Sequence, residues 1–228
     1  MNKKTACIVG LDLAGSPQRP TGACRLSGGR AATTILFSDE EILAYVAAAR
    51  PALVTIDAPL HLPPGRSSIH DRNAVHYRPC DLELRARGIP FFPITLGPMR
   101  TLTERGLALR AALEERGFRV AEMYPGGAQD VWGLPRARRD PAALRRGLVR
   151  RGAAGLVPNA SDHELDAATG ALVGLLHLAG RGEVYGDFQS GAILMPAGPN
   201  RRRSLRRGRE RRPLSAQKSA GRVRSRGR

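Results

Sequence analysis

The sequence predicts an α/β domain built on a mixed five-stranded sheet, with helices on both faces and a helical insert after the fourth strand. Apolar, β-branched runs of strand length alternate with longer segments that have helical apolar spacing. The first three runs are separated only by turn-like segments, which predicts an antiparallel meander. Helices separate the later runs, which predicts a mixed sheet covered on both faces. Hydrophobic residues make up 42% of the 228 residues and aromatic residues only 4%, so the core must be aliphatic.

The five strands are predicted from short apolar runs that end at turn residues. They cover residues 5–13, 23–29, 31–38, 52–60 and 118–125. Between the first two strands, residues 14–22 are rich in Gly, Pro and Ser, which is typical of a turn. Residues 183–196 are expected to close the domain as a small hairpin.

Two capping boxes mark helix starts, because Ser is followed three residues later by Glu at Ser38–Glu41 and at Ser161–Glu164. The helices are expected after Ser38, over 81–88 within the insert, and over 101–117, 140–152 and 161–179. The stretch from 126 to 136 has two adjacent glycines and is predicted to be a turn region. Residues 61–80 are expected to be irregular. Arg78, Asp81 and Arg85 in the insert could pair with each other or contact a phosphodiester.

The positive charge is concentrated at the C-terminus. Residues 200–228 hold 13 of the 37 Lys and Arg and one of the 20 acidic residues, so they carry +12 of the net charge of +17. A segment with one sign of charge and few apolar residues is expected to be disordered. The sequence therefore predicts a domain over 1–199, which retains +5, and a disordered Arg-rich tail over 200–228. Such a tail can bind phosphate backbones, or it can reflect a general preference for Arg, since the chain has 34 Arg and three Lys.

Several classes of protein are disfavoured. No apolar run approaches the length of a membrane helix. The apolar run near the N-terminus is short and is interrupted by Asp12, so it is predicted to be a strand rather than a signal peptide, and a cytoplasmic location is expected. Three distant cysteines without a CxxC pair are expected to be reduced, mostly buried thiols rather than disulfides or zinc ligands. No nucleophile elbow, P-loop or dinucleotide fingerprint is present.

Acidic residues stand at the ends of three apolar strands. Asp12, Asp57 and Glu122 each lie near the C-terminal end of a buried run, where an uncompensated charge would be costly. Ligand sites of open α/β sheets form at such strand ends. Carboxylates that converge there would form an oxygen-only site for Mg²⁺ or Mn²⁺. Two such ions can activate a water and stabilise the leaving oxygen in phosphodiester cleavage.

The last long helix opens with three acids. Glu164 completes the capping box, and Asp162 lies in the first turn, where the helix dipole favours a negative charge. Asp166 has neither role. Because Asp162 and Asp166 are four residues apart, they share a helix face and repel unless a cation is near. A solvated helix edge is the alternative explanation for Asp166.

These residues lie within motifs that resemble a known group of proteins. The acids on the first and fourth strands and "HELDA" at the start of the last helix resemble the RNase H-like superfamily, and the last motif is similar to the His-x-x-Asp-Ala segment of Holliday-junction resolvases. The stretches "GLDLAGSPQRPTG", "IDAPLHLP", "CDLELRARGIPFFP", "GPMRTLTERG", "EMYPGGAQDVWGLPR" and "HELDAATGALVG" together resemble a widespread prokaryotic family of unknown function. That family is usually described as predicted nucleases of the RNase H fold, and the resemblance covers residues 5–197.

The resemblance implies roles for individual residues. Asp12, Asp57 and Asp166 would bind metal, with Asp12 bridging two ions. Glu122 would be a fourth ligand or an orienting group. Asp162 could assist as a ligand. His163 could orient a water or a phosphate, although a surface histidine at a helix start is the favoured explanation.

The function expected on this basis is a metal-dependent hydrolase, a nuclease or phosphodiesterase acting on DNA or RNA with Mg²⁺ or Mn²⁺. The alternative is a non-catalytic nucleic-acid-binding module on the same fold. Its low aromatic content would make such a module a binder of the phosphate backbone rather than of stacked bases. An ATP-handling relative of the actin-like group is disfavoured, because those proteins resemble two such domains and this chain has room for one.

Overall fold

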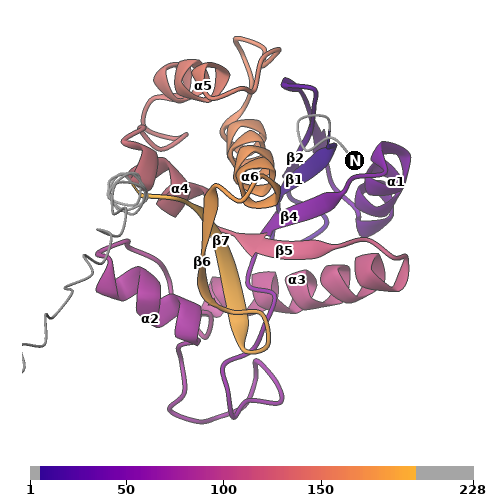
Figure 1. Ribbon diagram of the computed structural model, residues 1–228. Coiled ribbons are helices and arrows are strands. Elements are labelled where there is room, and N and C mark those ends of the chain that lie inside the picture. The colour runs from indigo at the N-terminus through magenta and orange to yellow at the C-terminus, as the bar shows by residue number, and fades with distance from the viewer. Residues whose placement is uncertain (1–5, 199–228) are drawn as a thin grey trace, which may run out of the picture. The chain divides into compact units, whose positions relative to one another are not determined.

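The computed structural model describes residues 6–198, which contain a single seven-stranded mixed sheet in the order β3-β2-β1-β4-β5-β7-β6 (Figure 1). The strands are β1 (Ile8–Asp12), β2 (Thr21–Ser27), β3 (Arg30–Leu36), β4 (Leu53–Asp57), β5 (Val120–Met123), β6 (Gly182–Asp187) and β7 (Gly191–Pro196). The helices are α1 (Asp39–Ala49), α2 (Pro79–Ala86), α3 (Gly97–Glu115), α4 (Pro125–Trp132), α5 (Pro141–Arg150) and α6 (Asp162–Leu178).

The predicted meander is confirmed, whereas the predicted count of five strands is wrong. β2 pairs antiparallel with both β1 and β3, and β4 and β5 continue the sheet in parallel. The C-terminal hairpin of β6 and β7 does not stand apart, because β7 pairs in parallel with β5. All six residues of β7 are buried, and a strand that is apolar on both faces is stable only inside a covered sheet.

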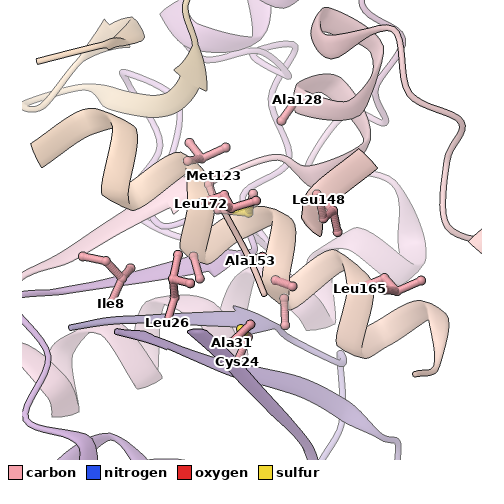
Figure 2. Close-up of a cluster of buried hydrophobic side chains, with 14 of the residues drawn as sticks. Ile8, Cys24, Leu26, Ala31, Met123, Ala128, Leu148, Ala153, Leu165 and Leu172 are labelled. Atoms are coloured by element: carbon pink, nitrogen blue, oxygen red, sulfur yellow. The ribbon is translucent and has the colours of Figure 1, made fainter. Parts of the chain in front are cut away.

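Helices cover both faces of the sheet, as the sequence predicts. α4, α5 and α6 pack on one face, where Ile8 and Met123 of the sheet belong to one buried cluster with Leu172 of α6 (Figure 2). α1 and α3 pack on the opposite face around Val9 and Ile56. α2, in the predicted helical insert, packs against β6 and β7. Figure 1 shows α6 lying across the sheet, with α5 on the same side and α3 on the other.

The backbone of α6 lies unusually close to the sheet at two glycines. A Cβ atom at Gly10 of β1 would overlap the carbonyl oxygen of Ala167, and one at Gly22 of β2 would overlap that of His163. Only glycine leaves room for such an approach. Both helix carbonyls belong to the first turns of α6, so these two glycines fix where the acids of that segment lie.

The turn predicted over 126–136 is largely a helix, α4. Pro125 occupies its first turn, and Gly133 ends it in the left-handed conformation with φ of 64°, a common start and stop pattern. Gly126 and Gly127 lower the local helix propensity and hide this pattern in the sequence. Gly127 is needed because a Cβ there would collide with Tyr124. Tertiary packing therefore overrides local preference in this segment.

The irregular segment between β4 and α2 is organised by one buried arginine. Arg66 donates hydrogen bonds to the carbonyl oxygens of Asp71, Asn73 and Val75, at 2.6, 3.2 and 2.5 Å. A single guanidinium thus satisfies three backbone acceptors of a loop that has no regular structure of its own.

Other expectations concern the ends of the chain and the cysteines. Both capping boxes are present. Cys7, Cys24 and Cys80 are free thiols, as predicted. The tail predicted over 200–228 lies outside the described residues. Within residues 6–198, none of the helices is both long and apolar enough to span a membrane.

Replacing Gly22 by Ala should lower the free energy of unfolding by about 1–3 kcal/mol, because the new methyl group forces α6 away from β2. Gly15→Ala is the matched control, since the nearest atom to its Cβ would be the amide nitrogen of Leu102 at an ordinary 3.5 Å. Urea unfolding of both variants measures the difference. Equal stabilities would show that α6 does not depend on this close approach.

Candidate metal-binding carboxylate site

Asp12 and Asp57 lie side by side at the ends of parallel strands. They are register partners in the pairing of β1 with β4, and neighbouring strands are about 4.8 Å apart. Burial raises the pKa of Asp57, and the proximity of the Asp12 carboxyl group raises it further. Side chains alternate between the two faces of a strand, and Gly10 and Thr55, two residues earlier, both face α6. Asp12 and Asp57 therefore project toward the face that α6 covers.

Asp166 comes to this pair from α6. The side-chain amide of Gln129, on α4, donates a hydrogen bond of 2.6 Å to its Oδ1. Gln129 is buried and also contacts the Thr169 hydroxyl at 3.1 Å. Burial, together with the charge of Asp12, raises the pKa of Asp166 to about 7, although the bond from Gln129 acts in the opposite direction.

The carboxylates repel one another. Burial raises the pKa of Asp57 well above its ordinary value, and the charges of Asp12, Asp166 and Glu122 raise it further. Burial and the neighbouring negative charges both disfavour the ionised form of Asp57, so a nearby positive charge would stabilise it. The sheet and α6 have therefore gathered three acids into one electrostatically coupled group.

His163 contacts the group from the first turn of α6. Its Nδ1 lies 2.6 Å from Oδ2 of Asp12, and the side chain is 28% exposed. This hydrogen bond, aided by the charges of Asp12 and Asp162, raises the pKa of His163. His163, for which a surface histidine at a helix start was one of two interpretations, thus lies in direct contact with Asp12.

Glu122 lies near the cluster but faces the other side of the sheet. It is the register partner of Ile56, whose side chain packs with α1 and α3. The guanidinium of Arg78 binds both of its oxygens, at 2.6 and 2.9 Å, and the backbone N–H of Leu60 donates to Oε2 at 2.8 Å. Burial raises the pKa of Glu122, and Arg78 acts against this rise. Of the two roles predicted for Glu122, this geometry favours the orienting group over the metal ligand.

Arg78 is the centre of a buried ion network. It is 2% exposed and also binds both oxygens of Asp81, at 2.9 and 3.1 Å. The pairing of Arg78 with Asp81 that the sequence left open is thus present, with Glu122 as a third member. A buried charge of this kind requires its partners, because removing one leaves the others uncompensated.

The remaining acids of α6 lie at the margin of the cluster. Asp162 pairs with the exposed Arg138 at 3.0 Å. Burial acts to raise the pKa of Asp162, but Arg138 and His163 outweigh burial, so the pKa of Asp162 is lowered. Glu164 completes the capping box with Ser161 and accepts a hydrogen bond of 2.7 Å from the Thr33 hydroxyl. Neither carboxylate is brought to Asp12 and Asp57.

The cluster fits a hard divalent cation in chemistry and position. Carboxylate oxygens are the preferred ligands of Mg²⁺ and Mn²⁺, and a cation would relieve the repulsion that raises the pKa of Asp57. Within the described residues, no three His, Cys, Asp or Glu side chains are already arranged to hold a metal ion. Asp12 is bound to His163 and Asp166 to Gln129, so binding would require these side chains to turn.

Comparison with known proteins identifies the family. Residues 10–190 match the model of the family described as "Protein of unknown function (DUF429)". The chain belongs to this family. The match covers most of the residues 5–197 over which the sequence resembles a prokaryotic family of unknown function. A search of curated proteins found no match.

Two solved structures resemble this DUF429 protein. The RuvC protein of T. thermophilus, in complex with a Holliday junction substrate, is 15% identical; the alignment covers 76% of this chain and 96% of RuvC, with a TM-score of 0.42. The yeast mitochondrial Holliday junction resolvase Ydc2 is 12% identical; the alignment covers 77% of this chain and 80% of Ydc2, with a TM-score of 0.38.

One residue and one pairing of the DUF429 site were missed from the sequence. Gln129 lies in the segment predicted to be a turn, so no helix was expected to present it to Asp166. Arg78 was singled out, but its pairing with Glu122, 44 residues away, was not foreseen. The alternation of β5 was the available signal, because it places Glu122 on the face that the insert covers.

Replacing Asp166 by Asn should stabilise the protein at neutral pH. The folded state holds the Asp166 proton more tightly than the unfolded state, so its stabilising contribution is present below pH 4 and is lost as the pH rises through about 7. We expect Asp166→Asn to raise the free energy of unfolding by about 1–2 kcal/mol at pH 8 and by little at pH 4.

Asp162→Asn is the control. Because the pKa of Asp162 is lowered, its ionised form stabilises the fold, and we expect Asp162→Asn to lower the free energy of unfolding at pH 8. Urea unfolding across this pH range measures both variants. A wild-type protein as stable as Asp166→Asn at pH 8 would contradict the placement of Asp166 in a repulsive cluster.

Proposed function

We propose that this protein is a metal-dependent phosphodiesterase that cleaves nucleic acid on an RNase H-like fold. The observation that carries the proposal is the coupling of Asp57 with Asp12 and Asp166, from two strand ends and one helix. In α/β proteins, ligand sites form at the carboxyl ends of parallel strands, and functional sites often contain carboxylates with perturbed pKa values. The proposed metal ligands are Asp12, Asp57 and Asp166.

Each ligand would act through its ionised form. Asp12 and Asp57 would bind Mg²⁺ or Mn²⁺ from the sheet, and Asp166 would bind from α6 after losing its proton. When bound, the metal supplies activation of a water and stabilisation of the charge on the leaving oxygen. His163, held by Asp12, would place a proton or a positive charge beside the phosphate.

Other residues would position these ligands. Gln129 would orient Asp166 through the bond it makes to Oδ1. Glu122, held by Arg78, would fix the segment that follows Asp57 through the Leu60 N–H. Asp162 is bound to Arg138 and would contribute only through its charge.

Exposed arginines favour a nucleic-acid substrate. Arg138, Arg139, Arg146 and Arg150 are exposed on α5 and the segment before it. Arg138 contacts Asp162 at the start of α6, the helix that carries Asp166. Cations beside a cluster of acids can hold the phosphate backbone that the acids alone would repel. Residues 200–228 would add a further +12 of charge.

The activity is tested with the full chain and labelled single-stranded and branched DNA and RNA. We expect cleavage that requires Mg²⁺ or Mn²⁺, stops in chelator, and falls by at least about 100-fold in Asp12→Asn while the protein stays folded. Asp162→Asn should retain most of the activity, because Asp162 lies outside the cluster.

Equal cleavage by wild type and Asp12→Asn would contradict the proposal. Binding that persists in chelator, weakens with salt and produces no cleavage would instead favour the alternative, a nucleic-acid-binding module without turnover.

A further inference from the structure

A cavity of about 300 Å³ opens beside Asp57. Its walls come from the segment after α2, the start of α3 and the end of β5. Apolar side chains from all three line it, including Phe91, Phe92, Met99 and Leu102, with Tyr124 at the start of α4. Phe92 is 69% exposed, so the cavity reaches the molecular surface.

The polar groups of the cavity wall are almost all occupied. Arg78, Asp81 and Glu122 bind one another, and Arg136 pairs with Asp130. Asp57 differs from them, because it lines the cavity and is also a member of the carboxylate cluster with Asp12 and Asp166. The cavity is therefore an apolar and aromatic chamber that meets the carboxylate cluster at one residue.

The wall is held in place without a ligand. The Tyr124 hydroxyl donates a hydrogen bond of 2.7 Å to the carbonyl oxygen of Pro90, and Arg136 donates to the same hydroxyl at 3.1 Å. Phe91 packs edge-on against Tyr77, with ring centroids 6.1 Å apart. A preformed site of this kind loses little conformational entropy when it binds.

The aromatic side chains are concentrated here. The chain has only ten Phe, Tyr and Trp residues, and three of them line this one cavity. The volume is at the lower end of the range for small-molecule pockets, which suits a planar ring system rather than a whole nucleic-acid strand. Aromatic side chains stack on nucleobases irrespective of sequence.

We propose that this cavity binds one unpaired nucleobase of the strand whose phosphate lies at the carboxylate cluster. The inference rests on the proposed function and narrows its substrate class. A base within a duplex is stacked and cannot enter such a cavity, so the substrate would be single-stranded, or would present a base that has left the stack. The low aromatic content of the whole chain therefore does not exclude base stacking at this one place.

The test is isothermal titration of the full chain in chelator, which separates binding from cleavage. One ligand is a trinucleotide, and the matched ligand is the same trinucleotide with an abasic central residue. We expect the wild type to bind the complete trinucleotide more tightly, and Phe92→Ala to weaken that binding by about 5- to 100-fold. Binding of the abasic ligand should not change, since its phosphates are the same.

Phe188→Ala is the matched control, because Phe188 is 58% exposed but does not line the cavity. It should leave both affinities unchanged. An equal effect of Phe92→Ala on both ligands, or no effect on either, would overturn the inference. If the protein bound a free nucleoside monophosphate tightly but did not bind the trinucleotide, the proposal that the base belongs to a nucleic-acid strand would be overturned.

Failure of the inference is distinguishable from failure of the proposed function. Suppose that the wild type cleaves with metal, that Asp12→Asn abolishes cleavage, and that Phe92→Ala binds the trinucleotide as the wild type does. The proposed base site would then be wrong and the proposed nuclease activity would stand. If the affinity depends on the base but no metal supports cleavage, the proposed base site would stand and the proposed nuclease activity would be wrong.

Discussion

The close approach of α6 to the sheet is the constraint on which the candidate site depends. At Gly10 and Gly22 the helix backbone lies directly against the backbones of β1 and β2, because neither strand has a side chain there. This contact sets the position of the first two turns of α6, which carry His163 and Asp166. A single methyl group at either glycine would separate these residues from Asp12 and Asp57.

The arrangement of charge follows from the same geometry. Asp12 and Asp57 project toward the face that α6 covers, so they meet Asp166 and His163 there. Glu122 is one residue out of phase and projects toward the insert, where Arg78 neutralises it. The two faces of the sheet thus have different chemistry where β1, β4 and β5 end: one holds acids in mutual repulsion, and the other a buried ion network. Asp57 also lines the apolar cavity, so the proposed base site and the proposed metal site share one residue.

Local signals predicted much of this protein, and contacts between distant residues account for most of what was missed. The capping boxes at Ser38 and Ser161 depend on residues three positions apart, and both helices begin there. The meander follows from short turns, and Asp12, Asp57 and Asp166 were placed together from strand ends and a helix start. By contrast, α4 is stabilised by tertiary packing around Gly127, which single-residue propensities cannot reveal. The pairing of β7 with β5 joins segments separated by about 70 residues of chain, so no local sequence pattern could predict it.

The most direct test of the carboxylate cluster is isothermal titration of Mn²⁺ into the full chain near pH 8, where Asp166 is ionised. If Asp12, Asp57 and Asp166 form a metal site, the wild type will bind Mn²⁺, Asp12→Asn and Asp166→Ala will lose most of that binding, and Asp162→Asn will keep it. If the wild type binds no Mn²⁺, or if all three variants bind it as the wild type does, the cluster is not a metal site and the account of its function is wrong.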